Sequence, residues 1–295
     1  MLRPVEHLMQ RNPDQLVCGP AKRLVEAMDR SGSAACVGLD PVVDRLPPGE
    51  PVEAIRAFSL GVIDAVAEHV ACIKIQSACY ERHGPDGLRV VDDVLAAAAD
   101  RDVPVILDAK RGDIGVSAAH YAAAAFERPA APDWLTVNGW LGGETIQPYL
   151  TCGGVFVLVR TSNPGAGEVQ QLKLADGRTM SEAMADLVAG MAAARPSWQG
   201  WTDVGAVVGA THPAEAEALR ARMPGVILLV PGIGAQGGTV DDCGPLFGPD
   251  GHGALVTASR SVIYAAPTSA PGWATAVSDA AAALAEESGA AAGLR

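Results

Sequence analysis

The chain alternates between short runs of Val, Ile and Leu and longer Ala-rich stretches in which apolar residues recur at helical spacing. The short runs have the length of a strand and are continuously apolar, as expected for parallel strands that are buried on both faces and joined by helical crossovers. Eight such strands are expected, at 34–39, 71–76, 103–108, 134–138, 155–160, 204–209, 226–230 and 254–258.

Helical patterns fill the intervals between these runs. They lie at 52–68, 86–100, 116–127, 143–150, 180–194, 213–222 and 272–287. The alternation predicts an α/β protein and matches a closed (β/α)₈ TIM barrel better than an open doubly wound sheet. Length alone allows one domain or two smaller ones. We expect a single barrel domain at 34–288, a helical lead-in at 1–33 that packs under or beside it, and a frayed tail at 289–295.

Composition and charge indicate which kinds of molecule the protein binds and where it is located. Lys and Arg number 22 against 34 Asp and Glu, for a net charge of −12, which argues against a nucleic-acid or anionic-membrane surface. No apolar run approaches the roughly 18–20 residues of a membrane helix, and no leader peptide is readable. The six cysteines form no C-x-x-C pair. We therefore expect a soluble, cytoplasmic protein with reduced, mostly buried thiols.

Polar residues fall at the carboxyl ends of the expected strands, where barrels of this kind carry their chemistry. They include Asp40, Asp108, Lys110, Asn138, Arg160, Ser162, Ser259 and Arg260. Lys74 lies inside a strand, and strand alternation turns it away from Ile73 and Ile75 and into the barrel. A buried ammonium needs carboxylates nearby; the alternative is a lysine at a strand end that reaches out to solvent.

The third strand ends in a D-x-K-x-x-D pattern made of Asp108, Lys110 and Asp113. Surface loops generate this pattern by chance, but at a strand end opposite Lys74 it predicts an array of charges that alternate in sign. Each charge then stabilises the ionised form of its neighbours. Such an array suits proton transfer at a carbanion-like centre.

A glycine-rich segment follows the seventh strand, and Gly232, Gly234 and Gly237 satisfy G-x-G-x-x-G. A dinucleotide fingerprint requires an acid about 20 residues later, but Ser259 and Arg260 stand in that region. The position in the barrel instead favours a phosphate held by backbone N–H groups and Arg260. Ordinary turn glycines are the alternative.

Two further features are less specific. The histidines show no metal-binding spacing, and although Asp40, Asp108 and Asp113 could in principle hold a hard cation, the interleaved Lys74 and Lys110 would repel it.

The segment 161–179 is long and polar for a βα loop. It is either an active-site loop or lid, or a solvated insertion.

These motifs together resemble the orotidine 5′-phosphate decarboxylase family, in its longer, mycobacterial-like subgroup. The resemblance covers essentially the whole barrel, and the run Asp-Ala-Lys-Arg-Gly-Asp-Ile-Gly at 108–115 is its most specific part. It rests on segments at 37–41, 74, 108–115, 160–164, 231–238 and 258–264.

The resemblance implies decarboxylation of orotidine 5′-monophosphate to UMP, the last step of de novo pyrimidine synthesis, without metal or organic cofactor. Lys110 would protonate C6, Asp108 would sit against the departing carboxylate, and Lys74 and Asp113 would complete the array. Asp113 would reach the site from a neighbouring subunit, so a homodimer with shared active sites is implied. Asp40 would bind a ribose hydroxyl, Ser162 the pyrimidine amide edge, and Gln236 and Arg260 the phosphate, with Ser259 and Gly234 beside it and Ser117 near the dimer-mate's ribose.

Three other functions remain open. Barrel relatives that act on sugar phosphates, such as hexulose-phosphate synthases and keto-gulonate-phosphate decarboxylases, share the D-x-K-x-x-D core but use magnesium and carry an acid where this chain has Lys74. A Schiff-base aldolase is disfavoured because flanking aspartates keep Lys74 and Lys110 protonated. A non-catalytic phosphate binder would gain nothing from costly buried charges.

Overall fold

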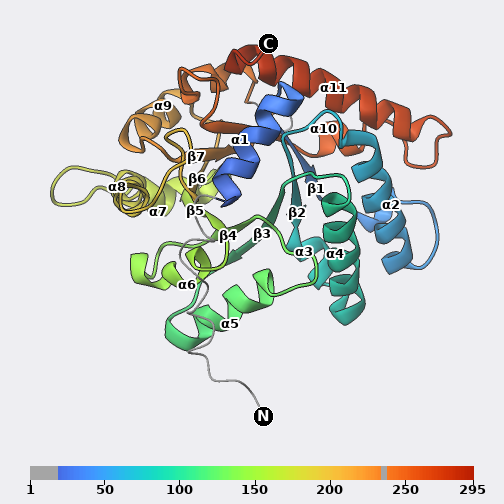
Figure 1. The fold of residues 1–295 in the computed structure, drawn as a ribbon, viewed down its shortest axis with the longest axis horizontal. Coiled ribbons are helices and arrows are strands. Elements are labelled where there is room, and N and C mark those ends of the chain that lie inside the picture. The colour runs from blue at the N-terminus through green and yellow to red at the C-terminus, as the bar shows by residue number, and fades with distance from the viewer. Residues whose placement is uncertain (1–18, 234–237) are drawn as a thin grey trace.

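Eight parallel strands close into a barrel in the computed structural model, which describes residues 19–233 and 238–295 (Figure 1). Each strand pairs with the next along the chain, and the last pairs with the first. The expected (β/α)₈ barrel is therefore confirmed, with strand boundaries within a few residues of those expected. The strands are β1 (Ala35–Leu39), β2 (Cys72–Gln76), β3 (Val105–Arg111), β4 (Trp134–Val137), β5 (Gly154–Arg160), β6 (Val204–Val208), β7 (Ile227–Val230) and β8 (Ala254–Ala258).

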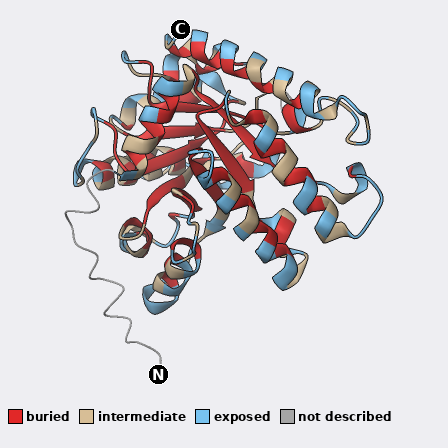
Figure 2. Cartoon of the chain, turned by 45° about the vertical axis from the view of Figure 1, so that its right-hand side comes forward, coloured by how far each residue is buried: buried red, intermediate tan, exposed pale blue. Residues whose placement is uncertain are grey.

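Helices surround the barrel and turn their apolar faces toward it, as the red inner and blue outer surfaces in Figure 2 show. They are α1 (Gly19–Ser31), α2 (Pro51–Val66), α3 (Ser77–Glu81), α4 (Gly84–Ala99), α5 (Gly115–Phe126), α6 (Gln147–Leu150), α7 (Gly167–Gln170), α8 (Met180–Ala193), α9 (Pro213–Arg222), α10 (Arg260–Ile263) and α11 (Trp273–Ala292). Among the described residues, no helix is long and apolar enough to cross a membrane.

The apolar residues form two cores because strand side chains alternate. One set, including Val37 and Ile73, packs beneath the outer helices. The other set, including Trp134 and Phe156, fills the barrel interior together with residues of α1. Figure 1 shows α1 lying across one end of the barrel. Because α1 seals that end, the opposite end, where the strands terminate, is the one left for a site.

Two hydrogen-bonded carboxylates hold α1 in place. Asp203 accepts the Ala21 N–H at 2.9 Å, and Asp133 pairs with Arg23 at 2.9 Å. Burial raises the pKa of both aspartates. This helix falls within the lead-in expected at 1–33; residues 1–18 lie outside the described ranges.

The tail expected to fray after Ser288 does not do so. Helix α11 continues to Ala292, and both Ser288 and Gly289 are buried. A Cβ on Gly289 would lie 2.3 Å from the carbonyl oxygen of Gly32, and Arg295 donates to the same oxygen at 2.9 Å. Contact with the chain just before β1 therefore holds the end in place.

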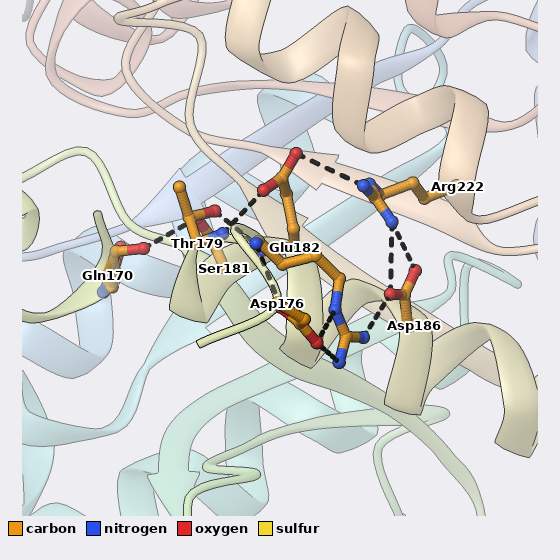
Figure 3. A network of polar contacts seen from close by, with 8 residues as sticks. Gln170, Asp176, Thr179, Ser181, Glu182, Asp186 and Arg222 are labelled. Carbon is orange, nitrogen blue, oxygen red and sulfur yellow. Dashed lines mark hydrogen bonds and ion pairs between the residues drawn. The ribbon is translucent and has the colours of Figure 1, made fainter. Parts of the chain in front are cut away.

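The segment 161–179 is anchored at both ends. The buried Arg160 pairs with Glu215 of α9 at 2.9 Å, and the Thr161 N–H donates to Gln170 of α7 at 2.9 Å. At its other end, Thr179 caps α8 through a capping box with Glu182. Figure 3 shows how this cap joins an ion-pair network that includes Asp186 and Arg222. The segment is thus a braced insertion, with its first residues facing the cavity described next.

Candidate active site

A cavity of about 450 Å³ opens at the carboxyl ends of the strands. It brings together seven residues that the sequence singles out: Asp40, Lys74, Asp108, Lys110, Ser162, Ser259 and Arg260. Its apolar lining includes Leu158, Val207 and Leu229. Gly234 and Gln236 lie outside the described residues, but their neighbours Gly232 and Ile233 line the cavity. The cavity therefore combines fixed charges with an apolar wall.

Asp108 is the centre of the charged cluster. Its Oδ2 lies 3.1 Å from Lys74 Nζ, and its Oδ1 lies 2.6 Å from Lys110 Nζ and accepts the Thr136 hydroxyl at 2.8 Å. Burial alone would raise the pKa of Asp108, but the two ammonium groups and these hydrogen bonds outweigh it and bring the pKa to about 2. The carboxylate is therefore ionised at neutral pH.

Lys74 points into the barrel, as strand alternation predicts, and is only 5% exposed. Burial disfavours its ammonium form, but Asp40, at 3.6 Å, and Asp108 more than compensate, so the pKa of Lys74 lies above its usual value. Lys74 is thus a fixed positive charge. Lys110 differs, because 47% of its side chain is exposed, which leaves its ammonium accessible from the cavity.

An irregularity in β3, on the side of β4, spans Asp108 and Lys110. Leu107 pairs with Leu135 and Arg111 with Val137, so three residues of β3 stand opposite the single residue Thr136 of β4. Lys110 adopts a left-handed backbone conformation with φ +48°, which is uncommon for a residue with a side chain. Asp108 faces the cavity by regular strand alternation, since Ile106 of the same strand belongs to the barrel interior, whereas Lys110 lies within the bulge.

The other side of the cavity is formed where β8 ends. Ser259 lies so close to β1 that a Cβ on Gly38 would be 2.0 Å from its hydroxyl oxygen, which only a glycine permits. Arg260 begins α10 and is exposed, and no ion pair joins it to another described residue. Its guanidinium is available to an anion.

Asp113 and Ser117 are not among the residues that line this cavity. Asp113 is half-buried and accepts the N–H of Ile114 at 2.8 Å; Ser117 is exposed on α5. Large apolar side chains are exposed around both residues and after β4: Ile114, Val116, Tyr121, Trp140 and Leu141. Gly112 lies against Asn138, so the segments that carry these apolar side chains are neighbours where β3 and β4 end.

Two strand threonines that line the cavity, Thr136 and Thr257, were not singled out from the sequence. Thr136 contacts Asp108 directly. Thr257 of β8 lines the cavity, and its buried hydroxyl has no hydrogen-bond partner within the described residues. The available signal was a lone hydroxyl on an inward-facing position of an otherwise apolar strand, but pattern alone does not distinguish such a residue from a packed threonine.

Metal-ligand geometry is not found in the described part of the chain, where no three His, Cys, Asp or Glu side chains converge. Asp40 and Asp108 approach each other only across Lys74. The ammonium group occupies the position that a cation would take between these carboxylates.

The closed barrel, with an array of alternating charges around one cavity and an arginine that no other described residue pairs with, defines a (β/α)₈-barrel enzyme. The sequence profile of the Orotidine 5′-phosphate decarboxylase / HUMPS family matches residues 35–271, and the chain belongs to this family. The resemblance seen in the sequence is thereby confirmed.

Curated relatives and solved structures agree with this assignment. The orotidine 5′-phosphate decarboxylase of Rhodopirellula baltica is 40% identical over 267 residues, which cover 83% of this chain and 88% of the relative. That of Haloarcula marismortui is 43% identical over 249 residues, or 82% and 86% of the two chains. The structure of Leishmania donovani OMP decarboxylase has a TM-score of 0.77 at 32% identity and covers 92% of this chain and 98% of its own.

Proposed function

We propose that this chain removes CO₂ from orotidine 5′-monophosphate and yields UMP, the last step of de novo pyrimidine synthesis, without a metal or organic cofactor. The observation that carries the proposal is the contact of Asp108 with both Lys74 and Lys110 at 3.1 and 2.6 Å. An ionised carboxylate held between two ammonium groups is suited to a reaction in which negative charge moves from a carboxylate to a carbon atom.

The proposed chemistry needs only these side chains. The bond between C6 and the carboxylate breaks, its electron pair stays on C6, and CO₂ leaves. The Lys110 ammonium stabilises that developing charge and then transfers a proton to C6, after which solvent reprotonates the amine. A fixed ammonium in a water-poor cavity stabilises the charge without reorganisation. Repulsion between Asp108 and the substrate carboxylate is a second contribution to the rate. It raises the free energy of the bound substrate, an effect called ground-state destabilisation.

The remaining lining residues supply binding. We assign Arg260 and Ser259 to the phosphate, with Gln236 and Gly234 of the glycine-rich loop beside them. Asp40 takes a ribose hydroxyl, and Ser162 the amide edge of the pyrimidine. This division is supported by the exposed Arg260 guanidinium, which no other described residue pairs with, and by the separate cluster of Lys74, Asp108 and Lys110 in the same cavity. Binding energy at the phosphate then contributes to catalysis at C6.

A homodimer is part of the proposal. Asp113 and Ser117 belong to an exposed apolar surface that includes Trp140, 61% exposed, and Ile114, 62% exposed. Burial of this surface against a second copy would bring Asp113 and Ser117 to the partner's cavity and complete the four-charge array. Because the substrate and product are phosphorylated nucleotides, which do not cross membranes, the proposed location is the cytoplasm.

The sugar-phosphate activity within the same family is the second candidate. It is disfavoured by Lys74, since those relatives carry an acid at this position. The ammonium between Asp40 and Asp108 also leaves no room for the magnesium ion that they require.

Substitution of Lys110 tests the proposed reaction. Lys110→Ala should abolish formation of UMP, because the Lys110 ammonium is exposed to the cavity, whereas that of Lys74 is buried between Asp40 and Asp108. It should leave binding of UMP measurable by calorimetry, because the phosphate contacts remain. Retained turnover would refute the proposal, and loss of both turnover and binding would show that Lys110 is required for the site to form at all.

A further inference from the structure

Thr136 of β4 contacts both Asp108 and Lys110, the two residues that the proposed reaction places at the substrate carboxylate and at C6. It is 1% exposed, and its hydroxyl donates to Asp108 Oδ1 at 2.8 Å. The same hydroxyl oxygen accepts the backbone N–H of Lys110 at 2.9 Å. One side chain therefore contacts both the carboxylate and the backbone of the lysine that pairs with it.

These contacts follow from the bulge in β3. Because Asp108, Ala109 and Lys110 stand opposite Thr136 alone, the Lys110 N–H cannot find a carbonyl in the regular ladder. The Thr136 hydroxyl takes the place of that missing acceptor. In this way it satisfies a backbone donor at the point where Lys110 adopts φ +48°, a conformation that needs support from its surroundings.

The hydrogen atom of the hydroxyl has a fixed direction as a consequence. A hydroxyl has one hydrogen to donate and can accept at its oxygen. Since Lys110 N–H donates to Thr136, the hydroxyl hydrogen is left for Asp108. Asp108 Oδ1 then accepts hydrogen bonds from the Thr136 hydroxyl and from Lys110 Nζ, while Asp108 Oδ2 accepts one from Lys74 Nζ. One of the three donors to the carboxylate is therefore a neutral hydroxyl on a buried strand residue.

From this geometry we infer that Thr136 is a positioning residue for the proposed decarboxylation. It fixes the orientation of the Asp108 carboxylate and the backbone of Lys110 relative to one another. The inference rests on the proposed function. It adds a residue to that function, because Thr136 does not belong to the charged array and is not assigned to the phosphate or the ribose. An error of about 1 Å in the placement of a catalytic group lowers rates strongly.

The test compares Thr136→Val with Thr136→Ser. Valine preserves the shape but removes the hydroxyl, and kcat should fall about 10- to 100-fold, as expected when a hydrogen bond to a charged group is lost. KM should change less than about threefold, because the phosphate contacts are untouched. Serine restores the hydroxyl, and kcat should return to within about fivefold of the wild-type value.

A matched control separates positioning from packing. Thr202, before β6, is also buried, donates to Gly225 O at 3.3 Å and accepts the Val204 N–H at 3.3 Å, but lies away from the cavity. Thr202→Val should lower the thermal midpoint without changing kcat. Should Thr136→Val fail to fold, the comparison of Thr136→Ala with Thr136→Ser carries the same test.

Three outcomes would overturn the inference while wild-type turnover stands. These are a Thr136→Val kcat within twofold of wild type, a Thr136→Ser variant as slow as Thr136→Val, or a loss confined to KM. Absence of turnover in the wild-type protein would instead refute the proposed function, so the two failures are distinguishable.

Discussion

Replacement of Asp108 by asparagine should destabilise the protein measurably, because the carboxylate compensates two ammonium groups at once. The pKa of Asp108 falls from 3.8 to about 2 in the folded chain, which at about 1.4 kcal/mol per pH unit amounts to about 2–3 kcal/mol at neutral pH. The amide also leaves the buried Lys74 with only Asp40, at 3.6 Å. Loss of one partner of a buried ion pair costs about 3–5 kcal/mol. These are two estimates of the same loss, and together they bracket it at about 2–5 kcal/mol.

The pH dependence of this difference has a definite sign. A carboxyl whose pKa is lowered by folding contributes stability above its unfolded pKa, near 4, and that contribution disappears as the pH falls toward the folded pKa, about 2. The difference in the free energy of unfolding between wild type and Asp108→Asn should therefore have its full value at pH 7 and be smaller at pH 3. Urea unfolding at both pH values measures it.

A double substitution identifies the cause of the destabilisation. In the Asp108→Asn background, Lys74→Met removes the unpaired ammonium and should recover part of the lost free energy of unfolding. Asp44→Asn is the control, because Asp44 is exposed and its change should stay within about 0.5 kcal/mol. An Asp108→Asn protein as stable as wild type at pH 7 would show that the carboxylate does not compensate the two ammonium groups.

Three further predictions concern substrate and assembly. Arg260→Gln should raise KM about 10- to 100-fold in steady-state kinetics, because a charge-assisted contact to phosphate is lost. An unchanged KM would show that the phosphate does not bind at Arg260. Trp140→Asp places a charge on the exposed apolar surface and should shift sedimentation toward monomer, whereas an unaltered dimer would exclude Trp140 from the interface. Lys110→Ala and Asp113→Ala proteins, each inactive alone, should regain activity when mixed and allowed to exchange subunits, and no recovery would argue against shared sites.

The barrel could be predicted from the sequence because its strands are buried on both faces and therefore read as continuous apolar runs. The inward direction of Lys74 followed from the same regularity, since Ile73 and Ile75 flank it in an unbroken strand. Positions at the ends of strands were also informative, because all eight strands end at the same edge.

The bulges could not be predicted. Leu158 lines the cavity, and strict alternation would turn Arg160 inward as well, but the register of β5 against β6 shifts between these residues. Arg160 instead pairs with Glu215, so it braces the segment 161–179 and does not line the cavity. The contact between Thr136 and Asp108 depends in the same way on the register between β3 and β4, which a single sequence does not specify.

The order of the tail at 289–295 was missed for a related reason. Gly289 lies against Gly32, far away in the sequence, and nothing in the local composition distinguishes this glycine from one in a loose end. Contacts between distant segments decided each of these differences.

Whether this chain decarboxylates orotidine 5′-monophosphate can be measured by the ultraviolet absorbance of that nucleotide on addition of purified protein, with EDTA present throughout. We expect rapid loss of the substrate band and stoichiometric appearance of UMP in the presence of the chelator. Absence of conversion, with phosphate-dependent ligand binding retained, would contradict this expectation and favour the sugar-phosphate or non-catalytic alternatives.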